Sequence, residues 1–375
     1  MAGLTRTGQL LGELVAIESV NPSFGGAGEA VLASFVADWL RRAGADVALQ
    51  EVMPGRNNVI AVVRAGSGPA LLLDAHLDTV SADSWRDGDP WTPRVEAGRL
   101  YGRGSCDTKA SMAVFMERMA HYAARPARLG RPMVFAATID EEDRQSGAYR
   151  LLDHDFGVGI GAAIAGEPTL CRLIHAHKGL IRFQVETRGT AAHASNPSLG
   201  DNAIARMNRI LNGLADLIRD FDGRAPHPTL GRPTLNPGTI RGGTAVNVVP
   251  DRCVLEVDRR LIPGEAAADA LLEIERIVAG DTRVTVTPHY DRPALDTALD
   301  LPFVREFRRA IRSGGRDDTP AVAGYLTNAV AFASRGIPAV VFGPGNVAQA
   351  HTDHEYLELA ELDAATGILQ CFLEN

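Results

Sequence analysis

The sequence is poor in lysine, in cysteine and in long apolar runs, and each shortage excludes a class of protein. Lysine occurs only at Lys109 and Lys178 among 38 basic residues, and the net charge of -8 includes no basic stripe, so nucleic acid is not an expected partner. No apolar stretch is long enough to cross a bilayer, and residues 1–20, interrupted by Glu13 and Glu18, predict a folded helix rather than a signal peptide. The four cysteines lie far apart without pair spacing, which favours a reducing cytoplasm.

The length of 375 residues predicts more than one domain. Helical and strand patterns alternate from the N-terminus, as in a doubly wound α/β domain, and this pattern returns near Asp300. Between them, alternating strands and amphipathic helices indicate an α+β unit. We therefore expect a larger domain with a mostly parallel sheet, at 1–177 and 289–375. It is interrupted at 178–288 by a domain of two helices and a four-stranded antiparallel sheet.

Hydrophobic periodicity assigns the main elements of both domains. Helices are expected at 29–44, 109–124, 202–221, 265–279 and 301–312, and strands at 57–64, 180–188, 253–258 and 283–287.

Four short apolar runs, each followed by acids or histidines, are the most informative feature that is present. They are 69–73 before Asp74, His76 and Asp78; 132–139 before Asp140, Glu141 and Glu142; 161–165 before Glu167; and 338–342 before a Gly-Pro-Gly turn and His351. Such runs are typical of buried parallel strands, and ligands bind beyond the carboxyl ends of those strands. Acids gathered at one edge repel one another unless a cation lies among them, so the pattern predicts a metal site.

Two candidate motifs, one of them outside these four runs, have competing interpretations. His76 is a candidate ligand whose ring would be oriented by the carboxylate of Asp78, although a simple His–Asp hydrogen bond near a turn is the alternative. Asp107 ends the glycine-rich turn 101–107, where it could be a helix N-cap or a carboxylate that bridges two metals.

Glu141 and Glu142 are expected to have different roles. Adjacent residues on a strand point to opposite sides, so one could bind metal while the other acts as a general base; an exposed acidic turn is the alternative. Glu167 follows another buried strand and is a further candidate ligand. The two lysines stand beside candidate site residues, and we predict that site geometry holds Lys109 and Lys178, with chance as the alternative.

In this order, along essentially the whole chain, the motifs resemble those of the dinuclear zinc aminoacylase and carboxypeptidase family. The resemblance rests on His76-Leu-Asp78, Tyr101-Gly-Arg-Gly with Asp107-Thr-Lys109, Asp140-Glu-Glu142, Gly166-Glu-Pro-Thr169, His177-Lys-Gly179, Ala192-His-Ala-Ser195 and Gly343-Pro-Gly with Ala350-His351. Several segments look most like the branch of acetylornithine deacetylase and succinyl-diaminopimelate desuccinylase. The run from Gly343 through Glu355 to Leu357 looks closest to acetylornithine deacetylase.

The resemblance implies a pair of divalent metal ions, zinc or alternatively cobalt or manganese, bridged by Asp107. His76 and Glu167 would complete one ion, and Glu142 and His351 the other. Glu141 matches the general base of the family. A cis peptide bond after Asp107 is also implied.

The inserted domain would be a lid that pairs two chains into a homodimer. His193 matches the lid histidine that reaches the partner's active site, while Asn247 and Arg260 match positions that line the substrate pocket. Thr327 is a further expected substrate contact. Its neighbour Asn328 replaces a frequent acid, which weakens the argument for a substrate with a cationic side chain.

The implied reaction is hydrolysis of the amide bond in an N-acyl amino acid, with no nucleic-acid or membrane partner. Desuccinylase-like activity, or carboxypeptidase or dipeptidase action on a short peptide, are alternatives that the sequence leaves open. A catalytically silent binding module on the same fold would have lost a ligand or the base, and none is missing here.

Overall fold

The computed structural model describes residues 3–374, which form two compact units. Within the described residues, unit 1 consists of 3–175, 297–321 and 327–374, and unit 2 consists of Ala176–Asp296 and Val322–Leu326. The chain thus leaves unit 1, forms most of unit 2 and returns to unit 1.

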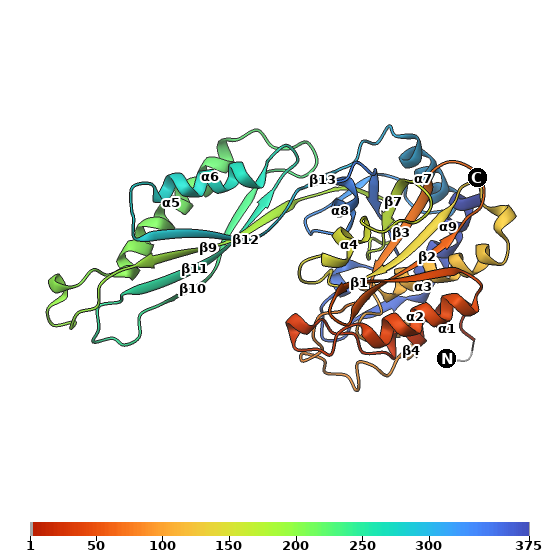
Figure 1. The fold of residues 1–375 in the computed structure, drawn as a ribbon, viewed down its shortest axis with the longest axis horizontal. Helices are drawn as coiled ribbons and strands as arrows, with labels where there is room; N and C mark the ends of the chain where they lie inside the picture. Colours follow the sequence, from red (N-terminus) through yellow and green to blue (C-terminus); the bar gives the residue numbers. More distant parts are fainter. Residues whose placement is uncertain (1–2, 375) are drawn as a thin grey trace. The chain divides into compact units, whose positions relative to one another are not determined.

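A large mixed sheet is the centre of unit 1 (Figure 1). Its strands are β1 (Asp46–Met53), β2 (Arg56–Val63), β3 (Ala70–His76), β6 (Met133–Thr138), β7 (Ile160–Ala165), β8 (Ile174–His177), β13 (Leu295–Asp296), β14 (Ala321–Ala323) and β15 (Ala339–Val341). The order is β1-β2-β6-β3-β7-β15-β8-β13, with β14 paired to β8, and the boundary between the units falls within β8. The four apolar runs form β3, β6, β7 and β15, which are parallel neighbours as predicted.

Antiparallel strands flank this parallel centre. A short turn with Gly55 at φ 74° joins β1 to β2, and so short a connection forces an antiparallel hairpin. On the other side β8 runs antiparallel to β15 and to β13. The expectation of an α/β domain with parallel strands is confirmed, with a larger antiparallel share than the sequence patterns suggested.

Helices cover both faces of this sheet. They are α1 (Arg6–Val15), α2 (Ala30–Arg42), α3 (Lys109–Ala123), α4 (Ser146–Leu151), α7 (Pro302–Ser313), α8 (Ala329–Ala333) and α9 (Leu359–Glu374). Alternate residues of β2, such as Val59 and Ala61, join one large core cluster with α1, α2, α3, α7 and α9. The intervening Ile60 is equally buried but outside that cluster, and α4 and α8 pack against each other and against β6, β7 and β15.

A small sheet ties two loops of unit 1 together. It contains β4 (Arg94–Glu96), β5 (Arg99–Tyr101) and β16 (Tyr356–Glu358), in the order β16-β5-β4. The pairing of Tyr356 with Tyr101 brings the segment after His351 beside the glycine-rich turn that leads to Asp107. Short 3-10 helices lie at Pro22–Phe24, Pro126–Arg128, Pro197–Leu199 and Val347–Gln349.

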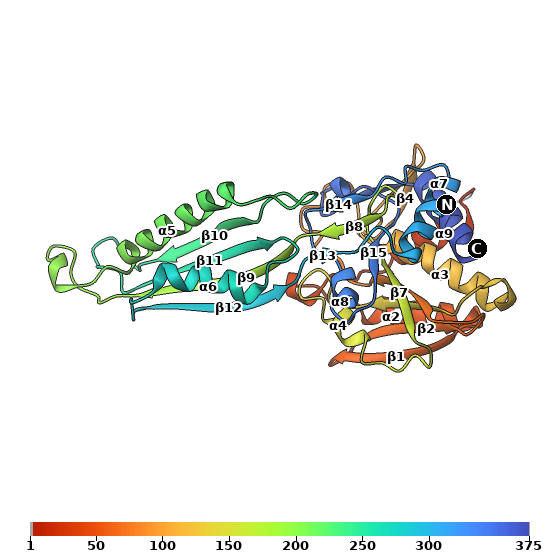
Figure 2. The ribbon, with the colours of Figure 1, turned by 90° about the horizontal axis from the view of Figure 1, so that it is seen from above.

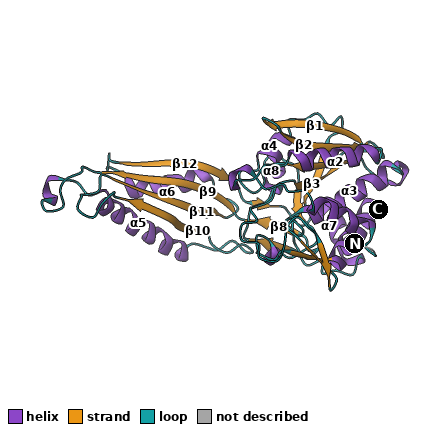
Figure 3. Ribbon diagram, turned by 90° about the horizontal axis from the view of Figure 1, so that it is seen from below, coloured by secondary structure: helices purple, strands orange, loops and turns teal. Residues whose placement is uncertain are grey.

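Unit 2 is the expected α+β arrangement. Its antiparallel sheet has the order β10-β11-β9-β12, from β9 (Gly179–Arg188), β10 (Thr234–Gly242), β11 (Arg252–Leu261) and β12 (Val284–Arg292). The helices α5 (Ala203–Gly223) and α6 (Ala267–Val278) lie on the same side of this sheet (Figures 2 and 3). Alternate residues of β9 and β11, such as Phe183 and Leu255, form a core with these helices.

Across residues 3–374, no helix is both long enough and apolar enough to span a membrane.

Candidate functional site

Five side chains proposed as metal ligands converge at one edge of the unit 1 sheet, because each follows a strand or a turn that ends there. His76 is the last residue of β3, Glu142 lies in the turn after β6, and Glu167 follows β7. Asp107 ends the turn before α3, and His351 is reached from β15 through the Gly-Pro-Gly turn. The carboxyl ends of parallel strands thus supply most of the cluster.

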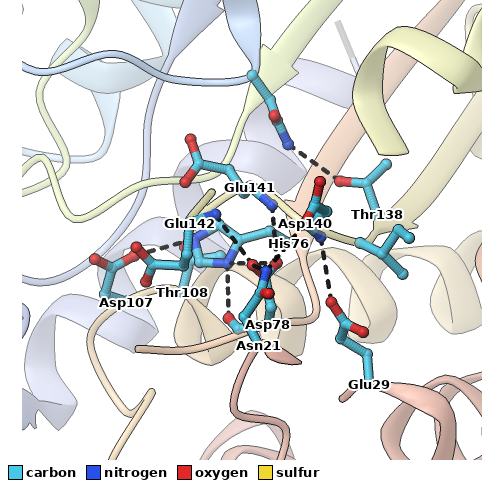
Figure 4. Close-up of polar contacts among 12 residues, drawn as sticks. Asn21, Glu29, His76, Asp78, Asp107, Thr108, Thr138, Asp140, Glu141 and Glu142 are labelled. Carbon is cyan, nitrogen blue, oxygen red and sulfur yellow. Dashed lines mark hydrogen bonds and ion pairs between the residues drawn. The ribbon is translucent and has the colours of Figure 1, made fainter. Parts of the chain in front are cut away.

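Asp107 is the centre of this cluster. Its Oδ1 lies 3.1 Å from Nε2 of His76, and its Oδ2 lies 3.3 Å from Nε2 of His351 (Figure 4 labels Asp107 and His76). The same His351 nitrogen is 3.2 Å from the Glu142 carboxylate, and the His76 nitrogen is 3.9 Å from Oε1 of Glu167. Each oxygen of Asp107 therefore faces a different imidazole, as a bridging carboxylate requires.

The alternative role of Asp107 as a helix cap is not observed. The residue at the N-cap position of α3 is Thr108, and its side chain forms no capping hydrogen bond. The peptide bond between Asp107 and Thr108 is cis, as the resemblance implied.

The charges in the cluster are out of balance without a cation. Burial, together with the charges of Asp107 and Glu141, raises the pKa of Glu167 well above its ordinary value. Burial likewise raises the pKa of Glu142, with Asp107 adding to it, and raises the pKa of Glu141 to about 8, where His76 opposes the shift and neighbouring carboxylates support it. The acids thus resist ionisation together, as neighbouring like charges do where water is partly excluded.

The histidines and Asp107 shift in the opposite sense. Burial opposes protonation of His76, but the hydrogen bond to Asp107 and the charge of Glu167 prevail and raise its pKa well above 6.5. Hydrogen bonds to Asp107 and Glu142 raise the pKa of His351 to about 11. Burial opposes ionisation of Asp107, yet these imidazoles hold its pKa well below the ordinary value. The cluster therefore favours positive charge between its carboxylates.

This donor set fits divalent metal ions. Two groups have ligand atoms within 4.8 Å of one another: His76 with Glu141 and Glu167, and His76 with Asp107 and Glu142. Carboxylate and imidazole are ligands of catalytic zinc and of similar divalent ions. Glu141 is as close to His76 and Glu167 as a ligand would be, so distance alone does not separate ligand from base.

The turn that carries Glu141 and Glu142 corrects one premise of the sequence analysis. β6 ends at Thr138, so these residues lie in a turn and not on a strand. The carboxylate of Asp78 accepts hydrogen bonds from the backbone N–H groups of both glutamates, each at 3.0 Å (Figure 4). Their different directions therefore come from a turn anchored by Asp78.

The predicted hydrogen bond between the His76 ring and the Asp78 carboxylate is also not the one formed. Nδ1 of His76 lies 2.9 Å from the backbone carbonyl oxygen of Asp78 and 3.7 Å from its Oδ1. The carbonyl orients the ring, while the carboxylate holds the glutamate turn.

A second layer of buried and half-buried polar residues was not predicted. Asn21 donates from Nδ2 to Asp78 at 2.8 Å and to Asp140 at 3.1 Å. Arg56 is paired with Glu29 at 2.6 Å and with Asp140 at 3.3 Å (Figure 4 labels Asn21, Glu29 and Asp140). These residues fix the start of the glutamate turn. No short motif marks them, since their contacts depend on the folded chain.

The two lysines lie in different environments. Lys109 is fully buried in unit 1, where its Nζ donates to the Ile17 carbonyl at 2.7 Å and lies 5.4 Å from the centre of the Trp91 ring. Lys178 belongs to unit 2, is partly exposed, and donates to the Arg232 carbonyl at 2.6 Å.

The candidate substrate contacts His193, Asn247 and Arg260 all belong to unit 2. Nδ1 of His193 lies 2.7 Å from Oγ of Ser195, and the exposed Asn247 accepts a backbone hydrogen bond from Ala194 beside it. Arg260 donates from Nε to Asp258 at 2.8 Å. The structure brings His193 and Asn247 together on neighbouring segments.

Thr327 and Asn328 lie in unit 1 and are buried. Oγ1 of Thr327 accepts from the backbone of Ala329 at 3.3 Å. Asn328 donates from Nδ2 to Oδ2 of Asp74 at 3.0 Å and to Oγ1 of Thr138 at 3.1 Å. Asn328 is thus a partner of a buried carboxylate inside the sheet, which accounts for its NH₂ group without reference to substrate.

Comparison with known proteins identifies a family whose members match most of this chain. The profile of peptidase family M20/M25/M40 matches residues 72–375. An acetylornithine deacetylase from Vibrio atlanticus (strain LGP32) is 32% identical over 367 residues, which cover 94% of this chain and 93% of the relative.

Solved structures share the fold. An M20 family metallo-carboxypeptidase from Sulfolobus solfataricus superposes with a TM-score of 0.82 at 17% identity, covering 99% of both chains. A dinuclear metal-binding peptidase of the M20 family from Bacillus subtilis gives 0.72 at 17% identity, covering 98% of this chain and 97% of the other. The family match spans most of the chain and includes every candidate ligand, so this chain belongs to peptidase family M20/M25/M40 and is a hydrolase that acts on amide bonds.

Proposed function

We propose that the protein is a metal-dependent amidohydrolase that removes the acyl group from an N-acyl amino acid, as an acetylornithine deacetylase does. The observation that carries this proposal is the placement of Asp107 between His76 and His351 among buried carboxylates. Relatives that bear the deacetylase name, at 31–32% identity over nearly the whole chain, support the choice of an acyl amino acid as substrate.

Two divalent ions, zinc or alternatively cobalt or manganese, would share Asp107. His76 and Glu167 would hold one ion, and Glu142 and His351 the other, in keeping with the distances among these groups. When bound, such ions polarise the amide carbonyl and make water acidic enough to supply a nucleophile near neutral pH.

Glu141 is the proposed general base. Its carboxylate would accept the proton of the attacking water and then deliver it to the leaving amine nitrogen. Asp78 holds the Glu141 backbone at 3.0 Å, and Asn21 holds Asp78, so the base is carried by a turn that is fixed before substrate arrives.

Residues of unit 2 would complete the reaction. We assign Arg260 to the substrate carboxylate, which a guanidinium can bind through two parallel hydrogen bonds. Asn247 is proposed as a further substrate contact, as is Thr327, which belongs to unit 1. The partner's His193 would stabilise the oxyanion in a homodimer, and loss of one such donor costs about 10²–10³ in rate.

No disulfide joins the cysteines within residues 3–374, which supports a cytoplasmic setting.

The direct test replaces Glu141 with Gln. We expect turnover to fall by about 10²–10⁴-fold while two metal ions per chain remain bound, because the base is lost and the proposed ligands are not. Glu358→Gln, which changes a partly exposed glutamate paired with Arg99, is the matched control and should be active. Normal activity of the Glu141 variant would end the assignment of the base.

A panel of N-acetyl amino acids, N-succinyl amino acids and dipeptides then separates the three candidate activities. The proposal expects the N-acetyl compounds to have the highest kcat/KM. Preference for dipeptides would assign the chain to the peptidases of this fold instead. For the proposed trans role of His193, a fully active monomer in sedimentation is the contrary result.

A further inference from the structure

Glu355 is a fully buried carboxylate that is not among the proposed ligands or the base. Its Oε1 accepts from the backbone N–H groups of Cys106, at 2.8 Å, and Asp107, at 2.9 Å. Its Oε2 accepts from Nη1 of Arg103, at 2.7 Å, and from the backbone N–H of Gly104, at 3.0 Å. Four donors saturate the lone pairs of one carboxylate, which is what allows a charge to be buried there.

All four donors come from the glycine-rich turn that ends at Asp107. This segment is a turn rather than a helix or strand, and the Glu355 carboxylate accepts hydrogen bonds from three of its backbone N–H groups. The same segment is tied back a second time, because Nη2 of Arg103 donates to the Thr352 carbonyl at 3.0 Å and the N–H of Gly102 donates to the Glu355 carbonyl at 3.2 Å. The Glu355 side chain therefore fixes the backbone conformation of the segment that carries Asp107.

Glu355 also stands four residues after His351. The next residue, Tyr356, pairs as a strand residue with Tyr101, which begins the glycine-rich turn. Glu355 thus joins the two segments that present Asp107 and His351, whose side chains meet at 3.3 Å between Oδ2 and Nε2.

We propose that Glu355 is a positioning residue for the metal pair: it holds the turn 103–107 in the metal-binding conformation and fixes the spacing of Asp107 to His351. This inference rests on the proposed roles of Asp107 and His351 as ligands. Outer residues that orient ligands typically contribute about 10–100-fold to metal affinity.

Glu355→Gln tests this with almost no change of shape. An amide offers one oxygen and one NH₂ group, which is a donor. If the amide oxygen occupies the place of Oε1, the NH₂ group faces Arg103 and Gly104; if it occupies the place of Oε2, the NH₂ group faces Cys106 and Asp107. Two of the four hydrogen bonds are lost in either orientation, so the turn is released.

The experiment is a titration of metal-free protein with Zn²⁺ by calorimetry, repeated with Co²⁺ to record the visible absorption of the bound ion. We expect wild type to bind two ions and Glu355→Gln to bind at least one of them about 10–100-fold more weakly, with an altered cobalt spectrum. Glu358→Gln is the control, since it removes the same charge three residues away without touching the turn, and should bind as wild type does.

The outcomes separate this inference from the proposed function. Wild type that binds no metal would contradict the proposed function itself. Wild type that binds two ions, with a folded Glu355→Gln variant of equal affinity and spectrum, would overturn the positioning role alone, even if the variant melts at a lower temperature.

A second measurement applies if the variant does not fold. In metal-free wild type, hydrogen exchange at the N–H groups of Gly104, Cys106 and Asp107 should remain slow, because Glu355 and not the metal holds them. Fast exchange at these amides in otherwise folded, metal-free protein would overturn the inference.

Discussion

Asp78→Asn is expected to disable the enzyme without removing any proposed ligand or the base. The Asp78 carboxylate is buried and accepts three hydrogen bonds, from Glu141 N–H to Oδ1 and from Glu142 N–H and Asn21 Nδ2 to Oδ2. Asparagine has the same shape but offers only one acceptor oxygen. The orientation that keeps two of these bonds leaves the N–H of Glu141 facing an NH₂ group.

The magnitude follows from these contacts. A buried N–H without a partner costs about 1–3 kcal/mol, and hydrogen bonds to a charged acceptor are worth about 1.5–3 kcal/mol each. We therefore expect the free energy of unfolding to fall by about 2–4 kcal/mol. Displacement of a catalytic group by about 1 Å can cost about 10²-fold in rate, so kcat should fall by about that factor as the Glu141 turn relaxes.

Urea unfolding and steady-state kinetics at saturating metal measure the two effects. Asp46→Asn, at an exposed carboxylate paired with Arg64, makes the same chemical change on the surface and should alter neither quantity appreciably. The reasoning fails if Asp78→Asn unfolds at the wild-type urea concentration and retains kcat within about threefold of wild type, a change of about 0.7 kcal/mol.

Three further predictions concern stability. Lys109→Arg should lower the free energy of unfolding by about 1–3 kcal/mol, because the larger guanidinium group must fit where the buried lysine is already closely packed. Lys178 is partly exposed, so Lys178→Arg should change the free energy of unfolding little, and equal effects of the two substitutions in chemical denaturation would contradict this. Burial lowers the pKa of His177 to about 4 from 6.5, so the unfolded chain binds the proton first and stability is lost as pH falls below about 6.5. Between pH 7 and 5 the free energy of unfolding of wild type should fall by about 2 kcal/mol more than that of His177→Asn, and parallel pH profiles of the two proteins would refute this. Asn328→Asp places a second carboxylate about 3 Å from Asp74 and should lower the free energy of unfolding by about 3 kcal/mol at pH 7. The double variant Asp74→Asn with Asn328→Asp exchanges the two residues and should restore most of this loss; no recovery in thermal unfolding would contradict the pairing.

The strands that carry the site could be predicted because their residues are apolar on both faces. β3 and β6 are buried along their whole length, so the apolar runs within them identify them without any knowledge of neighbours. The outer strands β1 and β10 were harder to predict from the sequence. β1 is exposed or half-buried at every position, and β10 carries Pro237 and is mostly exposed, so neither has a strong period of two.

Three ligand candidates could be predicted for the same local reason, since His76, Glu142 and Glu167 lie at or within a few residues of the ends of β3, β6 and β7. Asp107 lies in a glycine-rich turn, and His351 lies ten residues after β15. The residues that hold the ligands in place could not be predicted. Asn21 is 57 residues from Asp78 and 119 from Asp140, and Glu355 is 248 from Asp107. Nothing in a short window distinguishes such a buried carboxylate from a surface one, because the folded chain brings its donors to it.

One premise was wrong for a physical reason. Glu141 and Glu142 were assigned to a strand because the apolar run before them is long, but the backbone turns at Asp140, which adopts φ 67°. Hydrogen bonds from Ser146 and Asn21 to the Asp140 side chain stabilise that turn, and one of these partners is distant in sequence.

The most direct test of the account is anomalous diffraction at the zinc edge from crystals of the metal-loaded protein. The account predicts two peaks per chain, one on each side of the Asp107 carboxylate, the first beside His76 and Glu167 and the second beside Glu142 and His351. A single peak that Asp107 does not touch, or no peak among these residues in fully loaded protein, would contradict it.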